Sequence, residues 1–389
     1  MQLKSKLPDV GSTIFTTMSK MAVEYDAINL GQGFPDFNAD SKLLNLVSKA
    51  MSDGYNQYPY MTGVLELRQA ISTKVHSLYG HAYEPDTEIT ITSGATEAIM
   101  SAILATIHSG DEVIVLEPCY DCYIPAIRLA GGKPVRVQMV APSRGQSVFT
   151  VDWDCVKAAI TNKTRMLIVN TPHNPTGSIF SDDDLNALEN IVDSSDILLL
   201  SDEVYEHIIF DKHKHKSLAS SPALVHRSFV ISSFGKTTHT TGWKVGYCCA
   251  PKNLTAELRK VHQFVVFTVP SPFQHALATY TKNPESYLEL SKFYEQKRNL
   301  LKNGLLKTRF KPLESHGTFF LLADYSQISN QSESEFSIWL AQHHGVVVIP
   351  VSAFYAEPTA SNANHNIVRF CFAKKDTTLE SALDRLMRI

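Results

Sequence analysis

The chain has 389 residues, of which 44% are hydrophobic and 19% charged, and its formal net charge is −3. These values are typical of a globular protein, and the small net charge gives no reason to expect binding to nucleic acid or to an anionic membrane. No apolar run approaches the roughly 20 residues that a membrane-spanning helix needs.

The chain is longer than a single hydrophobic core usually serves, so we expect two domains. From about residue 87, short apolar runs alternate with segments in which apolar residues recur every three to four positions. The expected strands are residues 88–92, 112–116, 135–140, 166–170, 197–201, 229–232 and 245–250. The expected helices between them include residues 96–108, 152–160 and 182–191. This alternation predicts an α/β fold with a mostly parallel seven-stranded sheet covered by helices, whose last strand follows closely enough to be antiparallel.

A second pattern begins after about residue 285, with a long polar helical segment over residues 284–306. The strand patterns that follow it are residues 317–322, 345–350 and 367–372. Together with a terminal helix, they predict a smaller α+β domain. We therefore expect a large domain over residues 41–285 and a small domain over residues 286–389. Residues 1–40 are expected to form an N-terminal segment that packs with the small domain.

Lys236 is the first candidate for a catalytic side chain. It lies just beyond the apolar strand 229–232, in a loop rich in serine, glycine and threonine, and Lys244 follows shortly after. A lysine that condenses with an aldehyde needs such a setting. The backbone holds the lysine, hydroxyls and a second cation can take a phosphate, and shielding favours loss of its proton. The cofactor that this setting fits is pyridoxal 5'-phosphate (PLP).

Asp202 is the candidate partner for the pyridine nitrogen of PLP, which must stay protonated to draw electrons from the substrate. It ends the apolar run 197–201, and a carboxylate at the carboxyl end of a parallel strand points into the crevice where such sheets bind ligands. By strand alternation, Glu203 points the other way. The alternative is that Asp202 only caps the next helix.

Residues 93–97 form the candidate phosphate site, because they join a predicted strand to a predicted helix. Exposed backbone amides and the helix dipole favour an anion there. The residues concerned are Gly94, Ala95 and Thr96. Ser233 and Lys244 would add a hydroxyl and a charge. A turn and a helix cap would use the same residues without any ligand.

Three side chains suit the ring and its phenolic oxygen. Tyr120 follows the strand 112–116 and could stack on the flat ring, although such a tyrosine also packs in many loops. Asn174 is held extended by the proline after it and could bond the phenolic oxygen, as could Tyr205. The alternative for Asn174 is a turn rich in proline, asparagine and glycine.

Arg369 is the candidate for binding a substrate carboxylate. It stands alone in the otherwise apolar strand 367–372 of the predicted small domain. A guanidinium can bind a carboxylate through two parallel hydrogen bonds. The alternative is a structural ion pair.

Other motifs predict no chemistry. Cys119 and Cys122 have redox CxxC spacing but lack the usual Gly-Pro interior, and Gly31 and Gly33 start a dinucleotide fingerprint that no third glycine continues. Lysines interleave the histidines of residues 211–216, so we expect a solvated loop there, and no metal site. Six cysteines in so long a chain do not indicate a disulfide framework, so we expect a cytoplasmic protein.

Together these motifs resemble those of the class I aminotransferases, which are fold-type I PLP enzymes. The matching segments are Gly31-Gln-Gly-Phe-Pro-Asp36, Asn170-Thr-Pro-His-Asn-Pro175, Ser232-Ser-Phe-Gly-Lys236 and Thr241-Gly-Trp-Lys-Val-Gly246. The resemblance covers nearly the whole chain and is greatest to the methionine aminotransferases and the kynurenine/glutamine group. It implies a transaminase that moves the amino group of an L-amino acid to a 2-oxo acid by a ping-pong mechanism.

The resemblance also implies a role for each cofactor residue. Lys236 condenses with PLP and then moves the proton of the substrate α-carbon. Asp202 pairs with the pyridine nitrogen, Asn174 and Tyr205 bond the phenolic oxygen, and Tyr120 stacks on the ring. The residues implied to hold the phosphate are Ala95, Thr96, Ser233 and Lys244. Lys244 departs from the wider class, which usually has an arginine there, although close relatives share the lysine.

For the substrate, the resemblance implies that Arg369 and Asn174 bind the carboxylate near the Gly33 backbone. Phe15 resembles a position that lines the pocket for the substrate side chain. Tyr58 resembles the tyrosine that reaches the phosphate of the neighbouring subunit, which implies a homodimer with shared active sites.

No second arginine stands out as a partner for an acidic side chain. We therefore expect methionine as the preferred amino donor, with glutamine or aromatic amino acids also possible. A cysteine-conjugate or cystathionine-type C–S β-lyase is the main alternative. A PLP-binding transcription regulator would need a DNA-binding domain, for which residues 1–40 are too short and insufficiently basic.

Overall fold

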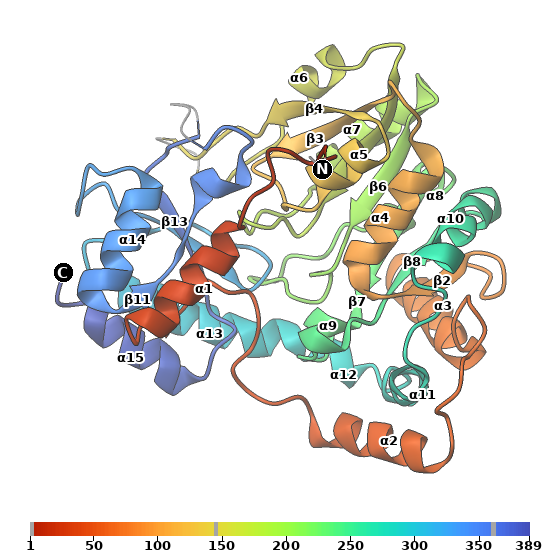
Figure 1. The fold of residues 1–389 in the computed structure, drawn as a ribbon, viewed down its shortest axis with the longest axis horizontal. Coiled ribbons are helices and arrows are strands. Elements are labelled where there is room, and N and C mark those ends of the chain that lie inside the picture. The colour runs from red at the N-terminus through yellow and green to blue at the C-terminus, as the bar shows by residue number, and fades with distance from the viewer. Residues whose placement is uncertain (1–3, 144–146, 359–362) are drawn as a thin grey trace.

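The structure is a computed structural model that describes residues 4–143, 147–358 and 363–389. Its elements form two groups, one around a large sheet and one around a smaller sheet (Figure 1). The N-terminal helix α1 (Ile14–Glu24) packs with the smaller group, although α2 (Ser41–Ser52), the next helix in the chain, lies with the larger one.

The large sheet has seven strands in the order β2-β8-β7-β6-β5-β3-β4. They are β2 (Ile89–Thr92), β8 (Gly246–Cys249), β7 (Ser228–Ser233), β6 (Leu198–Asp202), β5 (Thr164–Asn170), β3 (Glu112–Glu117) and β4 (Lys133–Gln138). The pairs are parallel except those of β8, which runs antiparallel to β7 and β2. The predicted sheet is confirmed, including its antiparallel last strand. One strand is displaced, because β4 pairs with β3 from Lys133 onward and Val140 lies beyond it.

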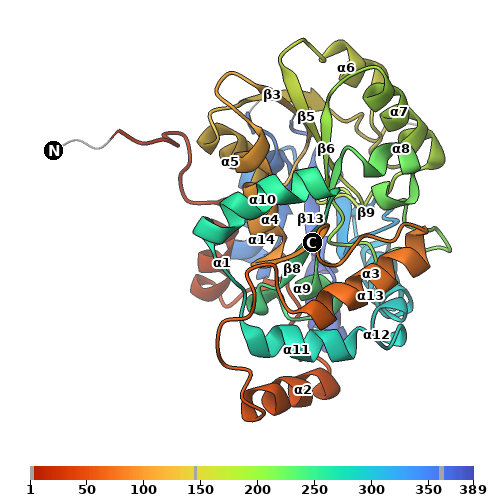
Figure 2. The same cartoon turned by 90° about the vertical axis from the view of Figure 1, so that its right-hand side faces the viewer.

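Helices cover both faces of the large sheet because its strands are apolar on both sides (Figures 1 and 2). In β3, Val113 and Val115 pack toward one face, whereas Ile114 and Leu116 pack toward the other. The helices on the first face are α4 (Gly94–Thr106), α5 (Tyr123–Leu129) and α10 (Lys252–Val265). Those on the second face are α3 (Leu65–Tyr79), α6 (Trp153–Ala158), α7 (Asp182–Asp193), α8 (Pro222–Val225) and α11 (Ser271–Tyr280). Helix α2 packs on α11.

The smaller sheet is antiparallel, and its own core lies between the sheet and its helices. Its strands in spatial order are β12 (Ile349–Pro350), β13 (Ile367–Cys371), β10 (Phe320–Asp324) and β9 (Lys311–Pro312). Its helices are α12 (Glu285–Leu288), α13 (Leu290–Leu305), α14 (Glu333–His344) and α15 (Asp376–Leu386). Single 3₁₀ turns lie at Leu218–Ser220, Thr241–Trp243 and Val351–Phe354. The single helix predicted over residues 284–306 is divided in the structure into α12 and α13, which meet at Glu289.

The N-terminal segment is tied to the smaller group by its backbone. Strand β1 (Ile28–Asn29) pairs in parallel with β11 (Val346–Val347). In α1, Met18 and Met21 are buried against Val347 and Phe354. The division of the chain at residues 40 and 285 stays a prediction.

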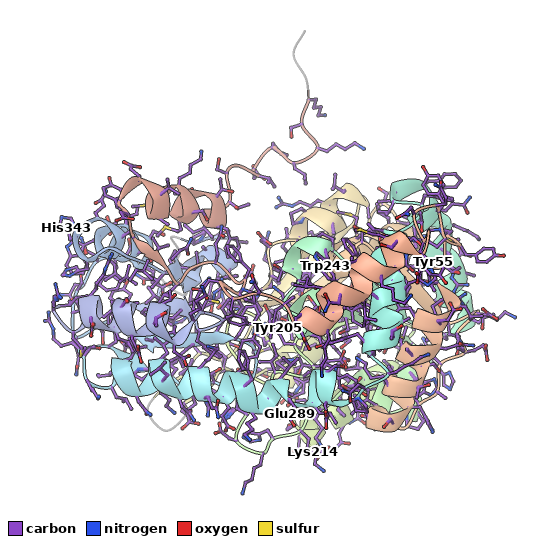
Figure 3. The ribbon with its side chains drawn as sticks, turned by 90° about the horizontal axis from the view of Figure 1, so that it is seen from below. Tyr55, Tyr205, Lys214, Trp243, Glu289 and His343 are labelled. Carbon is purple, nitrogen blue, oxygen red and sulfur yellow. The ribbon has the colours of Figure 1, made fainter. Side chains whose placement is uncertain are left out.

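The carboxyl ends of the parallel strands meet at one edge of the large sheet. The residues that end β2, β3, β5, β6 and β7 there are Thr92, Glu117, Asn170, Asp202 and Ser233. This edge faces the smaller group, and Tyr205, which follows β6, lies between the two groups (Figure 3). Open α/β sheets bind their ligands at such an edge.

Candidate active site

A cavity of about 370 Å³ opens at the carboxyl edge of the large sheet. Its wall is made by loops of the large sheet, by strand β13 of the smaller sheet and by the N-terminal segment. The predicted site residues that line it are Phe15, Gly33, Gly94, Ala95, Thr96, Tyr120, Asn174, Asp202, Tyr205, Ser233, Lys236, Lys244 and Arg369. The fold therefore brings together residues from both ends of the chain.

Lys236 lies in α9 (Phe234–Thr237), a single helical turn that starts where β7 ends. Ser233 caps this turn by accepting a hydrogen bond from the Gly235 N–H at 3.2 Å. The Lys236 amine donates to the Gly33 carbonyl at 3.1 Å and lies 5.6 Å from the centre of the Tyr205 ring. Burial lowers the pKa of Lys236 to about 8, helped by the neighbouring cations of Lys244 and Arg369. The amine therefore loses its proton more easily than an exposed lysine and can act as a nucleophile.

Asp202 lies at the end of β6 and is 4% exposed. Its carboxylate accepts a hydrogen bond from the Tyr123 hydroxyl at 2.7 Å, and Asn170 donates to its backbone carbonyl at 2.7 Å. Burial raises the pKa of Asp202 to about 6, against the hydrogen bonds from Tyr123 and the Val204 N–H. A cationic ring nitrogen beside this carboxylate would favour its ionised form.

The start of α4 has the shape of an anion site. Gly94 has φ +72°, a left-handed conformation that glycine adopts readily, and a Cβ there would lie 3.2 Å from the Lys244 Nζ. The N–H groups of the first helical turn, which include those of Ala95 and Thr96, have no partner within a helix. Together with Ser233 and Lys244 they fit the phosphate of PLP.

Arg369 is 1% exposed and is held from two sides. Its Nη1 donates to the Asn174 side-chain oxygen at 2.6 Å, and its Nη2 donates to the Gly31 carbonyl at 3.2 Å. The guanidinium also lies 3.7 Å from the centre of the Phe320 ring. Burial lowers the pKa of Arg369 to about 10. Among the described residues no acidic side chain forms an ion pair with Arg369 and its buried Nε has no partner, which favours a ligand over a structural pair.

Tyr120 lies at the cavity wall. Its ring centre lies 5.8 Å from that of Tyr123 in an edge-to-face contact. Tyr123 was not predicted as a site residue, although its position three residues after Tyr120, at a helix start, could have indicated it. Phe320 and Asp121, which also line the cavity, were not predicted either.

Tyr58 does not line the cavity. It is 81% exposed and contacts the ring of Phe267, with ring centres 5.4 Å apart. Its assignment to the active site of a neighbouring subunit stays a prediction.

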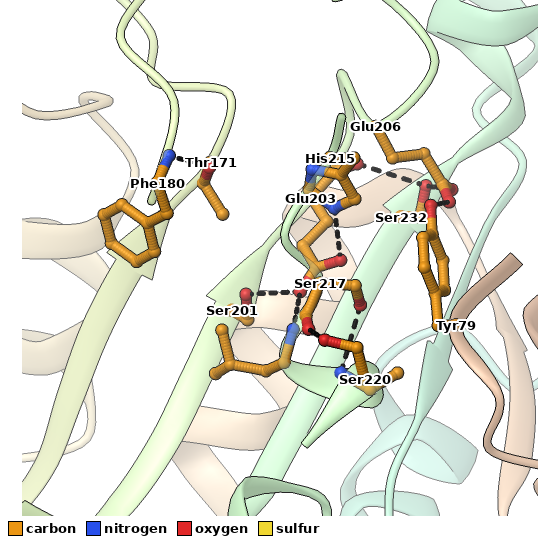
Figure 4. A network of polar contacts seen from close by, with 12 residues as sticks. Tyr79, Thr171, Phe180, Ser201, Glu203, Glu206, His215, Ser217, Ser220 and Ser232 are labelled. Carbon is orange, nitrogen blue, oxygen red and sulfur yellow. Dashed lines mark hydrogen bonds and ion pairs between the residues drawn. The ribbon is translucent and has the colours of Figure 1, made fainter. Parts of the chain in front are cut away.

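Glu203 points to the other side of the sheet from Asp202, as strand alternation predicts. Its carboxylate accepts a hydrogen bond from Ser201 at 2.7 Å and lies 2.7 Å from the Nε2 of His215 (Figure 4). The prediction of a solvated loop over residues 211–216 is therefore wrong at His215, whose ring the buried glutamate draws into the interior.

The fold and the site define the fold-type I class of PLP-dependent transferases. Within this class, residues 25–386 match the family of class I and II aminotransferases, and the chain belongs to that family. It is therefore an aminotransferase that acts on amino acids and 2-oxo acids, and enzymes of this family depend on PLP.

Individual relatives match over nearly their whole length. The methionine aminotransferase of Escherichia coli K12 is 47% identical over 387 residues, which cover 99% of this chain and 98% of that protein. The kynurenine–oxoglutarate transaminase of Dictyostelium discoideum is 33% identical, over 97% of this chain and 94% of that protein. These names do not favour the β-lyase alternative.

Solved structures show the same fold. An E. coli protein with methionine aminotransferase function has a TM-score of 0.96 and 46% identity, and the N-succinyldiaminopimelate aminotransferase of Mycobacterium tuberculosis has 0.95 and 38%. Both matches cover 100% of each chain.

Within the described ranges, no helix combines the length and apolar character that crossing a membrane requires.

Proposed function

We propose that this aminotransferase uses PLP to move the amino group of methionine to a 2-oxo acid, with glutamine and aromatic amino acids as further donors. The observation that carries the proposal is that one cavity holds Lys236, Asp202 and Arg369 together with the start of α4. An amine, a carboxylate, an anion site and a guanidinium match the aldehyde, ring nitrogen and phosphate of PLP and the carboxylate of an amino acid.

When bound, PLP would draw electrons from the substrate α-carbon and carry the amino group between the two substrates. Arg369 would bind the substrate carboxylate through its free N–H groups, and its contact with Asn174 would fix the orientation. Once displaced by the substrate, the Lys236 amine would take the α-proton and return it. The Gly33 carbonyl, which accepts a hydrogen bond from this amine at 3.1 Å, would keep it at the site.

Asp202 and Tyr205 would contact two different polar groups of the ring. The Asp202 carboxylate would keep the ring nitrogen protonated, and Tyr123 would hold the carboxylate in place. Tyr205 and Asn174 would donate hydrogen bonds to the phenolic oxygen. Tyr120 would cover the ring face.

The choice of donor is supported by the lining of the cavity. Phe15, Phe34 and Phe320 are apolar side chains on its wall, which suit a thioether or an aromatic ring. Among the described residues, no arginine other than Arg369 lines the cavity, so an acidic side chain lacks a cationic partner of that kind. The name of the E. coli relative supports methionine.

The test is a comparison of kcat/KM for methionine, glutamine, phenylalanine and aspartate with a 2-oxo acid acceptor. We expect methionine to rank first and aspartate last. Release of pyruvate and ammonia from a cysteine S-conjugate without an acceptor, faster than any transamination, would support the β-lyase alternative instead.

We also propose a homodimer, in which Tyr58 reaches the phosphate of the neighbouring subunit. The support is a set of exposed aromatic side chains, among them Tyr55, which follows α2 and stacks on His275 of α11 (Figure 3). Tyr58, Tyr60 and Phe264 are 81%, 83% and 86% exposed. Large exposed apolar side chains of this kind mark protein contacts. A cytoplasmic location is proposed as well, and the six free thiols support it.

A further inference from the structure

Asp121 is a second carboxylate on the cavity wall, and the proposed function gives it no role. It follows Tyr120 in the loop between β3 and α5 and lines the same cavity as Arg369. The other cavity carboxylate, Asp202, is buried and accepts hydrogen bonds from its neighbours. Asp121 as a whole residue is exposed, but its carboxyl lies close enough to the cavity wall for burial to raise its pKa. Among the described residues, only the Asp121 backbone itself is a hydrogen-bond donor to this carboxylate. Among the described residues, no other side chain therefore pairs with its charge through a hydrogen bond or an ion pair.

The charges of Asp121 and Arg369 act on each other. Burial raises the pKa of the Asp121 carboxyl, and the positive charge of Arg369 lowers it. Burial lowers the pKa of Arg369 to about 10, and Tyr205, Cys371 and the negative charge of Asp121 act in the opposite direction. The two side chains also line the same cavity, which places both beside the position where a substrate carboxylate would bind.

We propose that Asp121 selects against amino donors that carry a negatively charged side chain. This inference rests on the proposed function, because it requires an amino acid whose α-carboxylate is bound by Arg369. Direct contact with Arg369 would give the α-carboxylate two charge-assisted hydrogen bonds. These bonds outweigh the repulsion by the Asp121 carboxylate, because that repulsion acts over a longer distance. The repulsion of the α-carboxylate is also common to all donors and cancels when two donors are compared.

For a carboxylate on the substrate side chain, no hydrogen bond from Arg369 offsets the repulsion by Asp121. The cavity cations other than Arg369 are Lys236 and Lys244 among the described residues, and the proposed function assigns them to the aldehyde and the phosphate of PLP. The side-chain carboxylate would then meet the field of Asp121 in a partly closed cavity, where salt screens charges less than on an open surface.

The experiment compares glutamate with glutamine, which have the same shape and differ by one charge. The quantity measured is the ratio of kcat/KM for glutamate to kcat/KM for glutamine, with the PLP-loaded enzyme and one acceptor. In Asp121→Asn this ratio is expected to rise about fivefold, which equals about 1 kcal/mol. Asp121→Glu keeps the charge and should keep the wild-type ratio within about twofold. Asp183→Asn, which removes an exposed charge on α7 away from the cavity, should do the same.

An unchanged ratio in Asp121→Asn would overturn the inference, as would an equal rise in Asp121→Glu. A loss of kcat/KM by the same factor for both donors in Asp121→Asn would overturn it too, because it would show a role in positioning rather than selection. These results leave the proposed function intact. Wild-type enzyme that turns over neither methionine nor glutamine would instead contradict the proposed function itself.

A second measurement needs no variant. Glutarate and its monoamide differ by one charge, and both can offer a carboxylate to Arg369 as inhibitors that compete with the amino donor. The monoamide is expected to inhibit the wild-type enzyme with an inhibition constant about fivefold lower. Equal inhibition constants would overturn the inference even if the variants failed to fold.

Discussion

Arg369 and Asn174 are joined by a hydrogen bond of 2.6 Å from Nη1 to Oδ1. This bond ties strand β13 of the smaller sheet to the loop after β5 of the large sheet. It uses one of the five N–H groups of the guanidinium, and the buried Nε stays without a partner among the described residues. The arginine is therefore fixed in place while part of its binding capacity is left for a ligand.

The first prediction concerns this arginine. Arg369→Ala should lower kcat/KM for methionine at least about 100-fold, because a charge-assisted carboxylate contact is lost, and Arg369→Lys should lower it about tenfold, because the charge remains without the bidentate geometry. Steady-state kinetics measure both values. Arg227→Lys, at an exposed ion pair with Asp196, serves as the control and should leave kcat/KM unchanged. An Arg369→Ala enzyme with wild-type kcat/KM would exclude this residue as the carboxylate anchor.

The second prediction concerns the pH dependence of PLP capture by Lys236. The neutral amine is the reactive form, and the pKa of Lys236 is lowered to about 8. The rate of capture by cofactor-free protein should therefore rise about tenfold per pH unit below pH 8 and level off above it. Stopped-flow absorbance with added PLP measures this rate. A rate that still rises steeply between pH 9 and pH 10 would mean that Lys236 keeps the pKa of an exposed lysine.

The third prediction concerns the buried ion pair of Lys74 and Glu206 behind the cavity. Their N···O distance is 2.7 Å, and Glu206 also accepts hydrogen bonds from Tyr79 and Ser232 (Figure 4). Burial alone would raise the pKa of Glu206, but the charge of Lys74 and the other contacts hold it well below its usual value. Lys74→Met leaves this carboxylate without its cation and should lower the free energy of unfolding by about 3–5 kcal/mol.

Urea denaturation of the Lys74→Met variant measures that loss. The double variant Lys74→Met/Glu206→Gln should recover a large part of it, because no buried charge is then left alone. Lys49→Met, which removes an exposed lysine paired with Asp53, should cause no measurable change. Equal effects of Lys74→Met and Lys49→Met would contradict the account of the buried pair.

The fourth prediction tests the proposed dimer. Phe264 is 86% exposed at the end of α10, and Phe264→Asp would place a charge on the proposed subunit contact. We expect this variant to sediment as a monomer and to lose most of its activity, because Tyr58 could no longer reach a neighbouring subunit. Val23→Asp alters an equally exposed apolar residue on α1 and should stay dimeric. A Phe264→Asp variant that stays dimeric would exclude this surface as the interface.

Much of the site was predictable because its residues lie at the ends of buried strands. Asp202 ends one apolar run and Lys236 closely follows another, both of the kind that interior strands show, and parallel pairing brings such strand ends to one edge. Arg369 was predictable for a different reason, because a lone cation in an apolar strand needs a partner. Local sequence patterns thus indicated three side chains that the structure brings to one cavity.

Contacts between distant segments were not predictable in this way. Tyr123 donates a hydrogen bond to Asp202 from the start of α5, and no local pattern indicates that pairing. His215 lies between lysines, a pattern that predicts a solvent-exposed loop. Its ring is nevertheless in the interior, where it contacts the buried carboxylate of Glu203. Helix α4 begins at Gly94, two residues before the predicted start, and the left-handed conformation of Gly94 at this turn is not indicated by the local pattern of apolar residues.

The central claim is that Lys236 and Arg369 serve an amino-transfer reaction on methionine. The most direct test is to mix the PLP-loaded enzyme with L-methionine in the absence of any acceptor and to quantify the 2-oxo acid released. The account predicts one equivalent of 2-oxo acid per active site and none from Lys236→Ala. Release of no 2-oxo acid by the wild-type enzyme, or an equal amount from Lys236→Ala, would contradict the account.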